Sequence, residues 1–298
     1  MCGIVGLFLK DKALEPDLGA MLSEMLITMT DRGPDSAGIA VYGVGDESHI
    51  KISLQSENPD GDFAKLSSAM TQTIGSSFSV ERKSTHAIYA MPESELAAFQ
   101  TLVAEDFAHL TTMSRGQSME IFKEVGLPKD VVSRFGITQM AGTHGIGHTR
   151  MATESAVTTN GAHPFSTGAD QCLVHNGSLS NHNNLRRELI HNGITLETQN
   201  DSEVAAAYLT WQMQSGANLG EALESSLADL DGFFTFVVGT KDGFGVLRDP
   251  IACKPAVLAE TDKYVAFGSE YRALVSLPGI GDAKIWEPEP ATVYFWER

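Results

Sequence analysis

The sequence has few basic residues, few cysteines and no long hydrophobic run, and each scarcity argues against a class of protein. Its 298 residues include 21 lysines and arginines against 38 aspartates and glutamates, a formal net charge of −17. Because such a charge repels phosphate, it argues against nucleic acid and anionic membranes as partners. No apolar stretch reaches the roughly 20 residues that a membrane-spanning helix needs.

The cysteines are too few and too scattered for a disulfide framework or a Cys-x-x-Cys metal site, so we predict no metal ligand set. They are Cys2, Cys172 and Cys253, and we predict that the last two are core thiols. The N-terminal segment has no basic region before its short apolar run, so it does not resemble a signal peptide. These features predict an acidic, cytoplasmic protein.

The apolar pattern predicts an α+β domain in which helices and strands are layered around one core. Helical periodicity or helix boundary signals occur at 17–30, 181–191, 201–214 and 219–229. Short apolar runs bounded by Gly, Asp or Pro predict strands at 3–9, 39–42, 171–175, 233–238, 244–247, 255–259, 264–267 and 292–296. Residues 46–141 alternate charged and moderately amphipathic segments, including 63–71, 94–105 and 117–126. We interpret this region as an insertion or small subdomain.

The cysteine at position 2 is the first chemical signal. Aminopeptidases trim methionine before a small residue, which would leave the Cys2 thiol beside its own α-amine. The reference pKa is about 7.7–8.0 for that amine and about 8.5 for the thiol. One residue could therefore supply both a base and a nucleophile for acyl transfer. A small buried residue at the start of a strand is the alternative interpretation.

Two further groupings suit recognition of an α-amino acid amide. Asn176 and Gly177 follow an apolar run, and an asparagine amide beside a glycine N–H can form an oxyanion hole; a plain turn is the alternative. Arg150 offers a planar fork for a carboxylate, and Thr153 could add a hydroxyl donor. Asp201 could bind an ammonium group, or could simply be a charge at a helix N-terminus.

Six motifs occur in the order found in class II glutamine amidotransferases, which are N-terminal nucleophile hydrolases. They are MCGIVG, DRGPDSAG, GHTRMAT, NGAHP, VHNGSLSNH and NDSE. The sequence resembles this family, and the resemblance implies a four-layer αββα sandwich with two antiparallel sheets. The domain would occupy residues 1–298, with the inserted subdomain at about 46–141.

The resemblance also assigns roles to individual residues. Cys2 would be the nucleophile, and Asn176 with Gly177 would form the oxyanion hole. Arg150 and Thr153 would bind the glutamine carboxylate.

The remaining motif residues would support that pocket. Asp201 would bind the substrate ammonium, and Arg32 would order the loop around the nucleophile. His163 matches a position near the pocket, where a structural histidine is the alternative interpretation. We expect His148 and His175 to orient backbone groups.

Met151 stands where many family members have an aromatic residue, and the insertion separates DRGPDS widely from GHTR. With the phrase HTRMATES, these features resemble the stand-alone amidotransferase subunits of glutamate-synthase-type complexes, including that of N-methylglutamate synthase. That resemblance implies hydrolysis of glutamine, or of a γ-glutamyl alkylamide, with transfer of the amine to partner synthase subunits. Those partners would carry FMN and iron–sulfur clusters. We expect no cofactor in this chain, because it has no GxxxxGK[ST] loop and too few cysteines for a four-cysteine cluster.

Two other functions fit the same residues. The chain could be a non-hydrolytic scaffold or regulatory subunit that keeps the fold. It could also be a free-standing hydrolase of another amide, although Arg150 together with Asp201 favours an amino-acid substrate.

Overall fold

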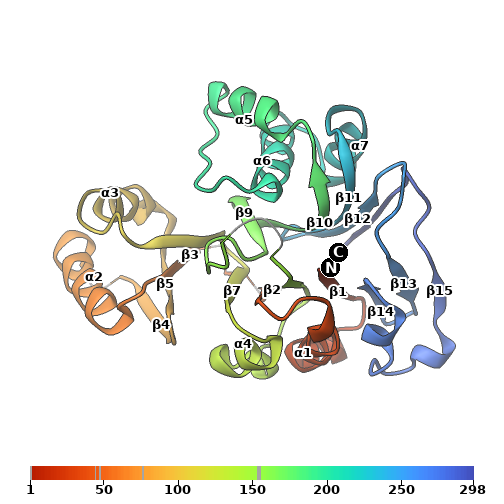
Figure 1. The fold of residues 1–298 in the computed structure, drawn as a ribbon. Helices are drawn as coiled ribbons and strands as arrows, with labels where there is room; N and C mark the ends of the chain where they lie inside the picture. The colour runs from red at the N-terminus through yellow and green to blue at the C-terminus, as the bar shows by residue number, and fades with distance from the viewer. Residues whose placement is uncertain (1, 44, 47, 76, 153–155) are drawn as a thin grey trace.

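Two antiparallel sheets lie face to face at the centre of the computed structural model, which describes residues 2–43, 45–46, 48–75, 77–152 and 156–298 (Figure 1). The first sheet has the strand order β15 (Lys284–Trp286), β13 (Val257–Glu260), β14 (Tyr264–Gly268), β1 (Gly3–Leu9), β8 (His144–Arg150), β2 (Ser36–Tyr42) and β7 (Met119–Val125). The second has the order β16 (Val293–Glu297), β12 (Gly243–Arg248), β11 (Gly232–Gly239), β10 (Gln171–Leu179) and β9 (Phe165–Gly168).

Helices cover the outer face of each sheet. Helices α1 (Leu18–Thr28) and α4 (Pro128–Phe135) pack on the first sheet, whereas α5 (His182–His191), α6 (Asp201–Gln214) and α7 (Leu219–Asp229) pack on the second (Figure 1). Short 3₁₀ turns are η1 (Lys12–Asp17), η2 (Thr30–Arg32), η3 (Glu93–Glu95), η4 (Ile137–Gln139), η5 (Tyr271–Leu274) and η6 (Ile280–Asp282). The predicted αββα sandwich is confirmed. Among the described residues, no helix has both the length and the apolarity needed to cross a membrane.

Alternation of side chains along the strands decides which residues face the space between the two sheets. In β1, Ile4 and Phe8 belong to the apolar cluster between the sheets, whereas Val5 and Leu7 pack against α1. Gly6 lies on the inner face, where an added Cβ would be 2.7 Å from the ring of Phe244 in the second sheet. This glycine therefore permits the two sheets to approach closely.

Helices α6 and α7 begin at capping residues that are visible in the sequence. The Asn200 side chain accepts a hydrogen bond from the N–H of Ser202, and Asn218 forms a reciprocal capping box with Glu221. Helices α6 and α7 accordingly have the predicted bounds, and α5 begins one residue later than predicted.

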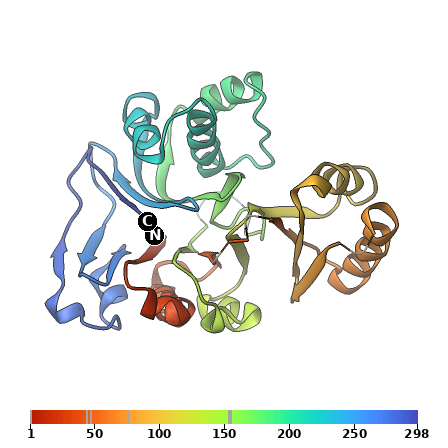
Figure 2. The same ribbon diagram turned by 180° about the vertical axis from the view of Figure 1, so that it is seen from behind.

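The region predicted as an insertion, 46–141, contains two different parts. Residues 49–116 form a separate sheet with the order β4 (Ser79–Lys83), β5 (His86–Pro92), β3 (His49–Gln55) and β6 (Thr111–Gly116). Helices α2 (Pro59–Ile74) and α3 (Leu96–Asp106) bury an apolar core of their own with this sheet, to one side of the central sheets (Figure 2). We call residues 49–116 the side subdomain. In contrast, the 117–126 segment supplies β7, which pairs with β2 in the first sheet.

Asp170, in the turn between β9 and β10, connects the second sheet to the β6–β7 turn. Its carboxylate accepts hydrogen bonds from the N–H groups of Gln117 at 2.7 Å, Ser118 at 2.9 Å and Met119 at 2.9 Å. At Gly116 an added Cβ would lie 2.1 Å from Asp170 Oδ1. This buried carboxylate therefore fixes the point where the side subdomain joins the sandwich.

We predict that Asp170→Ala lowers the free energy of unfolding by roughly 2–4 kcal/mol, because three backbone N–H groups lose a charged acceptor. Urea denaturation followed by circular dichroism measures this change. The matched control is Asp242→Ala, whose exposed carboxylate has Lys241 Nζ at 3.9 Å and should unfold like the wild type. Equal urea midpoints for the two variants would contradict this account.

Candidate active site

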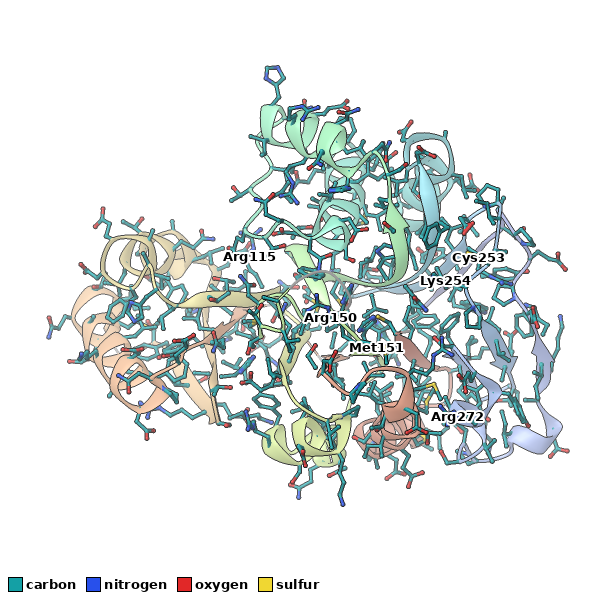
Figure 3. All side chains as sticks on the ribbon, viewed as in Figure 1. Arg115, Arg150, Met151, Cys253, Lys254 and Arg272 are labelled. Carbon is teal, nitrogen blue, oxygen red and sulfur yellow. The ribbon has the colours of Figure 1, made fainter. Side chains whose placement is uncertain are left out.

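Three predicted site residues lie in or beside strands whose inner faces meet. Cys2 precedes β1, Arg150 ends β8, and Asn176 lies in β10 of the opposite sheet. Each is an even number of residues away from a side chain in the cluster between the sheets, namely Ile4, Ile146 or Val174. Because side chains alternate along a strand, each therefore lies on the inner face. Figure 3 shows Arg150 near the middle of the molecule, between the layers. The sandwich thus brings together residues that are far apart in the sequence.

One cavity of about 800 Å³ collects most of the predicted site residues. Its lining includes Cys2, Arg150, His163, Asn176, Gly177 and Asp201. Thr153 lies outside the described residues. Arg32 lies beside the cavity and contacts Cys2 directly.

The carbonyl oxygen of Cys2 is held by one donor from the turn η2 and one from strand β10 of the second sheet. Arg32 Nε donates to it at 2.9 Å, and Asn176 Nδ2 donates to it at 3.3 Å. Arg32 is buried, and its Nη1 forms an ion pair with Glu270 Oε1 at 2.5 Å. Because an asparagine amide carries two N–H donors, Asn176 can hold Cys2 with one and offer the other to a ligand.

Gly177 occupies a position that no larger residue could share. Its φ is +159°, and an added Cβ would lie 2.0 Å from the carbonyl oxygen of Phe233 in β11. The same Cβ would also lie 2.7 Å from His175 Nε2. The Asn176–Gly177 pair therefore lies within strand β10 and does not form a turn. The close approach of strand β11 leaves room for glycine only.

The DRGPD segment, residues 31–35, packs against the backbone around Arg150, a contact that the sequence did not reveal. An added Cβ at Gly33 would lie 2.5 Å from the backbone of Arg150. The Asp35 carboxylate accepts from the N–H of Ala152 at 2.8 Å, and Thr149 Oγ1 donates to the carbonyl of Gly33. These contacts fix the end of β8, so the Arg150 guanidinium is buried at the cavity wall.

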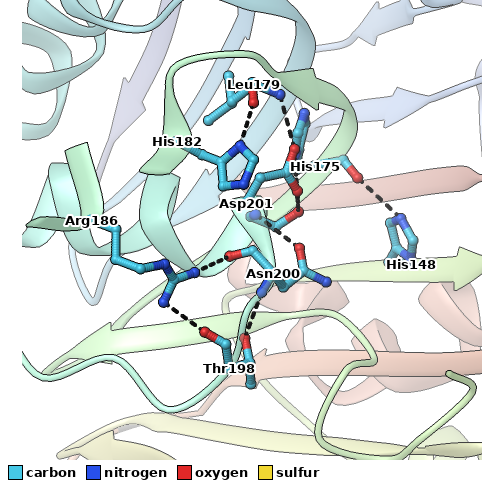
Figure 4. Close-up of polar contacts among 9 residues, drawn as sticks. His148, His175, Leu179, His182, Arg186, Thr198, Asn200 and Asp201 are labelled. Atoms are coloured by element: carbon cyan, nitrogen blue, oxygen red, sulfur yellow. Dashed lines mark hydrogen bonds and ion pairs between the residues drawn. The ribbon is translucent and has the colours of Figure 1, made fainter. Parts of the chain in front are cut away.

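Asp201 has the helix N-terminal position that the sequence predicted, and it also lines the cavity. It begins α6, and its Oδ2 accepts from the N–H of Leu179 at 2.9 Å (Figure 4). Its Oδ1 lies 4.0 Å from His175 Nδ1. The side chain keeps 21% of its surface exposed, and it lines the cavity. The carboxylate therefore fixes the end of β10 and still presents negative charge to a ligand.

Three buried histidines lie in or beside the cavity wall, and burial keeps them neutral at physiological pH. Burial lowers the pKa of His148 to about 3 and that of His175 to about 4, and it lowers the pKa of His163 well below its usual value. His148 Nε2 donates to the carbonyl of His175 at 3.2 Å (Figure 4), which agrees with the predicted backbone-orienting role of His148. The His163 ring stacks on the His148 ring with centroids 4.0 Å apart. A ligand would therefore meet uncharged imidazole at His163.

Lys254 is a cavity residue that sequence reasoning missed. It lines the same cavity, and its Nζ lies 5.0 Å from the ring centroid of Phe233. It adds a second positive charge to that of Arg150. It lies between β12 and β13, outside the six motifs, and the sequence therefore assigned it no role. Within the described ranges, no group of three or more His, Cys, Asp or Glu side chains is arranged to hold a metal ion.

The two remaining cysteines differ from each other. Cys172 is a buried core thiol as predicted; burial raises its pKa to about 12, and its Sγ lies 3.3 Å from the Tyr42 hydroxyl. The prediction for Cys253 was wrong, because this residue is exposed. It lies in the loop after β12, where Asp249 and Arg248 hold the backbone and leave the Cys253 side chain outside the core.

The chain is similar in sequence to known glutamine amidotransferases. A family model described as a glutamine amidotransferase domain matches residues 148–276. The chain is 67% identical to glutamine amidotransferase-like protein GlxB of Rhizobium meliloti, over 100% of this chain and 99% of that protein. It is 34% identical to a putative glutamine amidotransferase of Methanothermobacter thermautotrophicus, over 99% of each.

A solved structure shows the same fold at low sequence identity. It is glutamine phosphoribosylpyrophosphate amidotransferase from B. subtilis, with a TM-score of 0.64 and 19% identity. The match covers 99% of this chain and 47% of that protein, so this chain spans about half the length of that protein.

Proposed function

Because this chain belongs to the class II glutamine amidotransferases, we propose that it hydrolyses the side-chain amide of glutamine through a thioester on Cys2. One observation carries the proposal: a thiol, an amide beside a strand glycine, a guanidinium and a carboxylate all line one cavity. A guanidinium suits the substrate carboxylate and a carboxylate suits its ammonium. The thiol and the amide suit acyl transfer to sulfur.

The mechanism begins with removal of Met1, which frees the α-amine of Cys2. The amine takes the thiol proton, and Sγ attacks the side-chain carbonyl carbon of glutamine. Negative charge on the carbonyl oxygen is stabilised by the free N–H of Asn176 and by the backbone N–H of Gly177. The C–N bond then breaks as the amine returns the proton to ammonia, and water hydrolyses the thioester to glutamate.

The substrate is held by opposite charges on two walls of the cavity. Arg150 would bind the α-carboxylate, with the Thr153 hydroxyl as a second donor, and Asp201 would bind the ammonium. Neutral His163 would contact the substrate by hydrogen bonding. The cavity has a volume of about 800 Å³. This volume supports substrates larger than glutamine, namely γ-glutamyl alkylamides such as the methylamide.

We further propose that the amine passes to separate synthase polypeptides of glutamate synthase or N-methylglutamate synthase type, which carry FMN and iron–sulfur clusters. Relatives that match from end to end have a similar length, which supports an amidotransferase working beside other chains. The proposal includes a cytoplasmic location, where thiols such as that of Cys2 stay reduced.

We expect glutamine hydrolysis by the purified chain to be abolished by Cys2→Ala and slowed about 10²–10³-fold by Asn176→Ala, because an oxyanion donor is lost. Ammonia release from glutamine, asparagine and γ-glutamylmethylamide measures activity and substrate class, and intact mass reports whether Met1 is absent. Cys253→Ala is the matched control and should keep full activity. Undiminished hydrolysis by Cys2→Ala would contradict the mechanism, and inactivity of the wild type with every amide would favour a scaffold.

For the partner, we predict that affinity purification of the tagged chain from its native cells recovers flavin- and iron-containing polypeptides. Glutamine-dependent synthase activity should co-purify with them. If the isolated chain alone performed the complete synthase reaction, or if that activity separated from the chain, the partner proposal would be wrong.

A further inference from the structure

The segment 156–164 forms one wall of the cavity and contains neither helix nor strand. Ala156, Thr158, Asn160, Gly161 and His163 line the cavity, and an added Cβ at Gly161 would lie 3.4 Å from Arg150 Nη1. A wall without regular secondary structure needs other contacts to hold its shape. We call this segment the wall loop.

One buried lysine donates hydrogen bonds to the backbone of the wall loop. Lys123 lies in β7, and its Nζ donates to the carbonyl oxygens of Asn160 at 3.2 Å, Ala162 at 2.8 Å and Pro164 at 3.3 Å. An ammonium group has three donors, and here it has three carbonyl acceptors. Nζ also lies 4.8 Å from the ring centroid of Phe165, where a cation is favoured.

The wall loop lies directly on the first sheet at this point. An added Cβ at Gly38 in β2 would be 2.1 Å from the carbonyl oxygen of His163 and 2.5 Å from Lys123 Cβ. This close approach brings the loop carbonyls over the β2–β7 edge, within reach of the lysine. Lys123 itself does not line the cavity of Cys2, so it acts on a ligand only through the loop.

We propose that Lys123 is a positioning residue of the glutaminase site, which sets glutamine affinity by holding the wall loop against Arg150 and His163. This inference rests on the proposed function. It predicts that loss of the lysine raises KM more than it lowers kcat, because the loop forms a binding wall and carries neither the thiol nor the oxyanion donors.

The charge on Lys123 makes this contact sensitive to pH. Burial lowers the pKa of Lys123 to about 8, although nearby Glu203, Glu197 and Cys172 oppose that shift. The other titratable groups that it faces are His163 and His86, which burial keeps neutral. The ammonium therefore holds three carbonyls below pH 8 and loses a donor and its charge as pH rises through 8. Glutamine binding should weaken over the same range.

The test uses the Cys2→Ala protein, in which substrate binds without turnover. Calorimetry with L-glutamine at pH 7 and pH 9 should show weaker binding at pH 9. Lys123→Met should bind roughly tenfold or more weakly at pH 7, as expected for loss of hydrogen bonds from a charged donor. The arginine of Lys123→Arg keeps its charge at both pH values, so the affinity of this variant for glutamine should change less with pH. Deprotonation of glutamine itself affects all variants equally.

Hydrogen exchange of residues 156–164 in the same proteins separates this inference from the proposed function. Exchange should be faster with Lys123→Met. The matched control is Lys51→Met, which breaks an ion pair of 2.7 Å with Glu120 of β7 and should leave loop exchange and glutamine binding unchanged. Unaltered exchange and affinity in folded Lys123→Met, or an unchanged pH effect in Lys123→Arg, would overturn the inference. If residues 156–164 are protected from exchange in the Cys2→Ala protein and that protein binds no glutamine, the proposed function would be wrong instead.

Discussion

The double hydrogen bond to the carbonyl of Cys2 is the interaction on which the site depends. One donor, Arg32, follows the first helix, and the other, Asn176, lies in the opposite sheet. The residue before β1 is thereby fixed between the two layers. Because β1 is central in its sheet, between β14 and β8, the position of Cys2 is determined by the whole sandwich.

Close backbone approach is the second constraint, and it explains why glycines recur in the motifs. An added Cβ would come within 2.5 Å of the Arg150 backbone at Gly33, and within 2.1 Å of the His163 carbonyl at Gly38. At Gly177 it would come within 2.0 Å of the Phe233 carbonyl. Each glycine therefore lets a functional segment lie directly on a strand. The motifs specify backbone contact as much as they specify side-chain chemistry.

Local patterns and family motifs predicted much of the fold, whereas contacts distant in sequence escaped prediction. The bounds of α6 and α7 follow from capping residues and periodicity within a few turns of chain. Strand β7 looked like part of an insertion because its partner β2 precedes it by some 80 residues. Lys123 and Lys254 lie in segments without a motif, so only the folded chain reveals that one holds the wall loop and the other lines the cavity. Cys253 was misassigned because residue type alone predicted burial.

The central claim is that Cys2 carries the acyl group during turnover. Mass spectrometry of protein quenched in acid during steady-state hydrolysis of glutamine tests this claim most directly. The account predicts a γ-glutamyl group on the N-terminal peptide, released by mild alkali and missing in Cys2→Ala. Ammonia release with no such adduct under conditions that preserve thioesters, or with the adduct on another peptide, would contradict it.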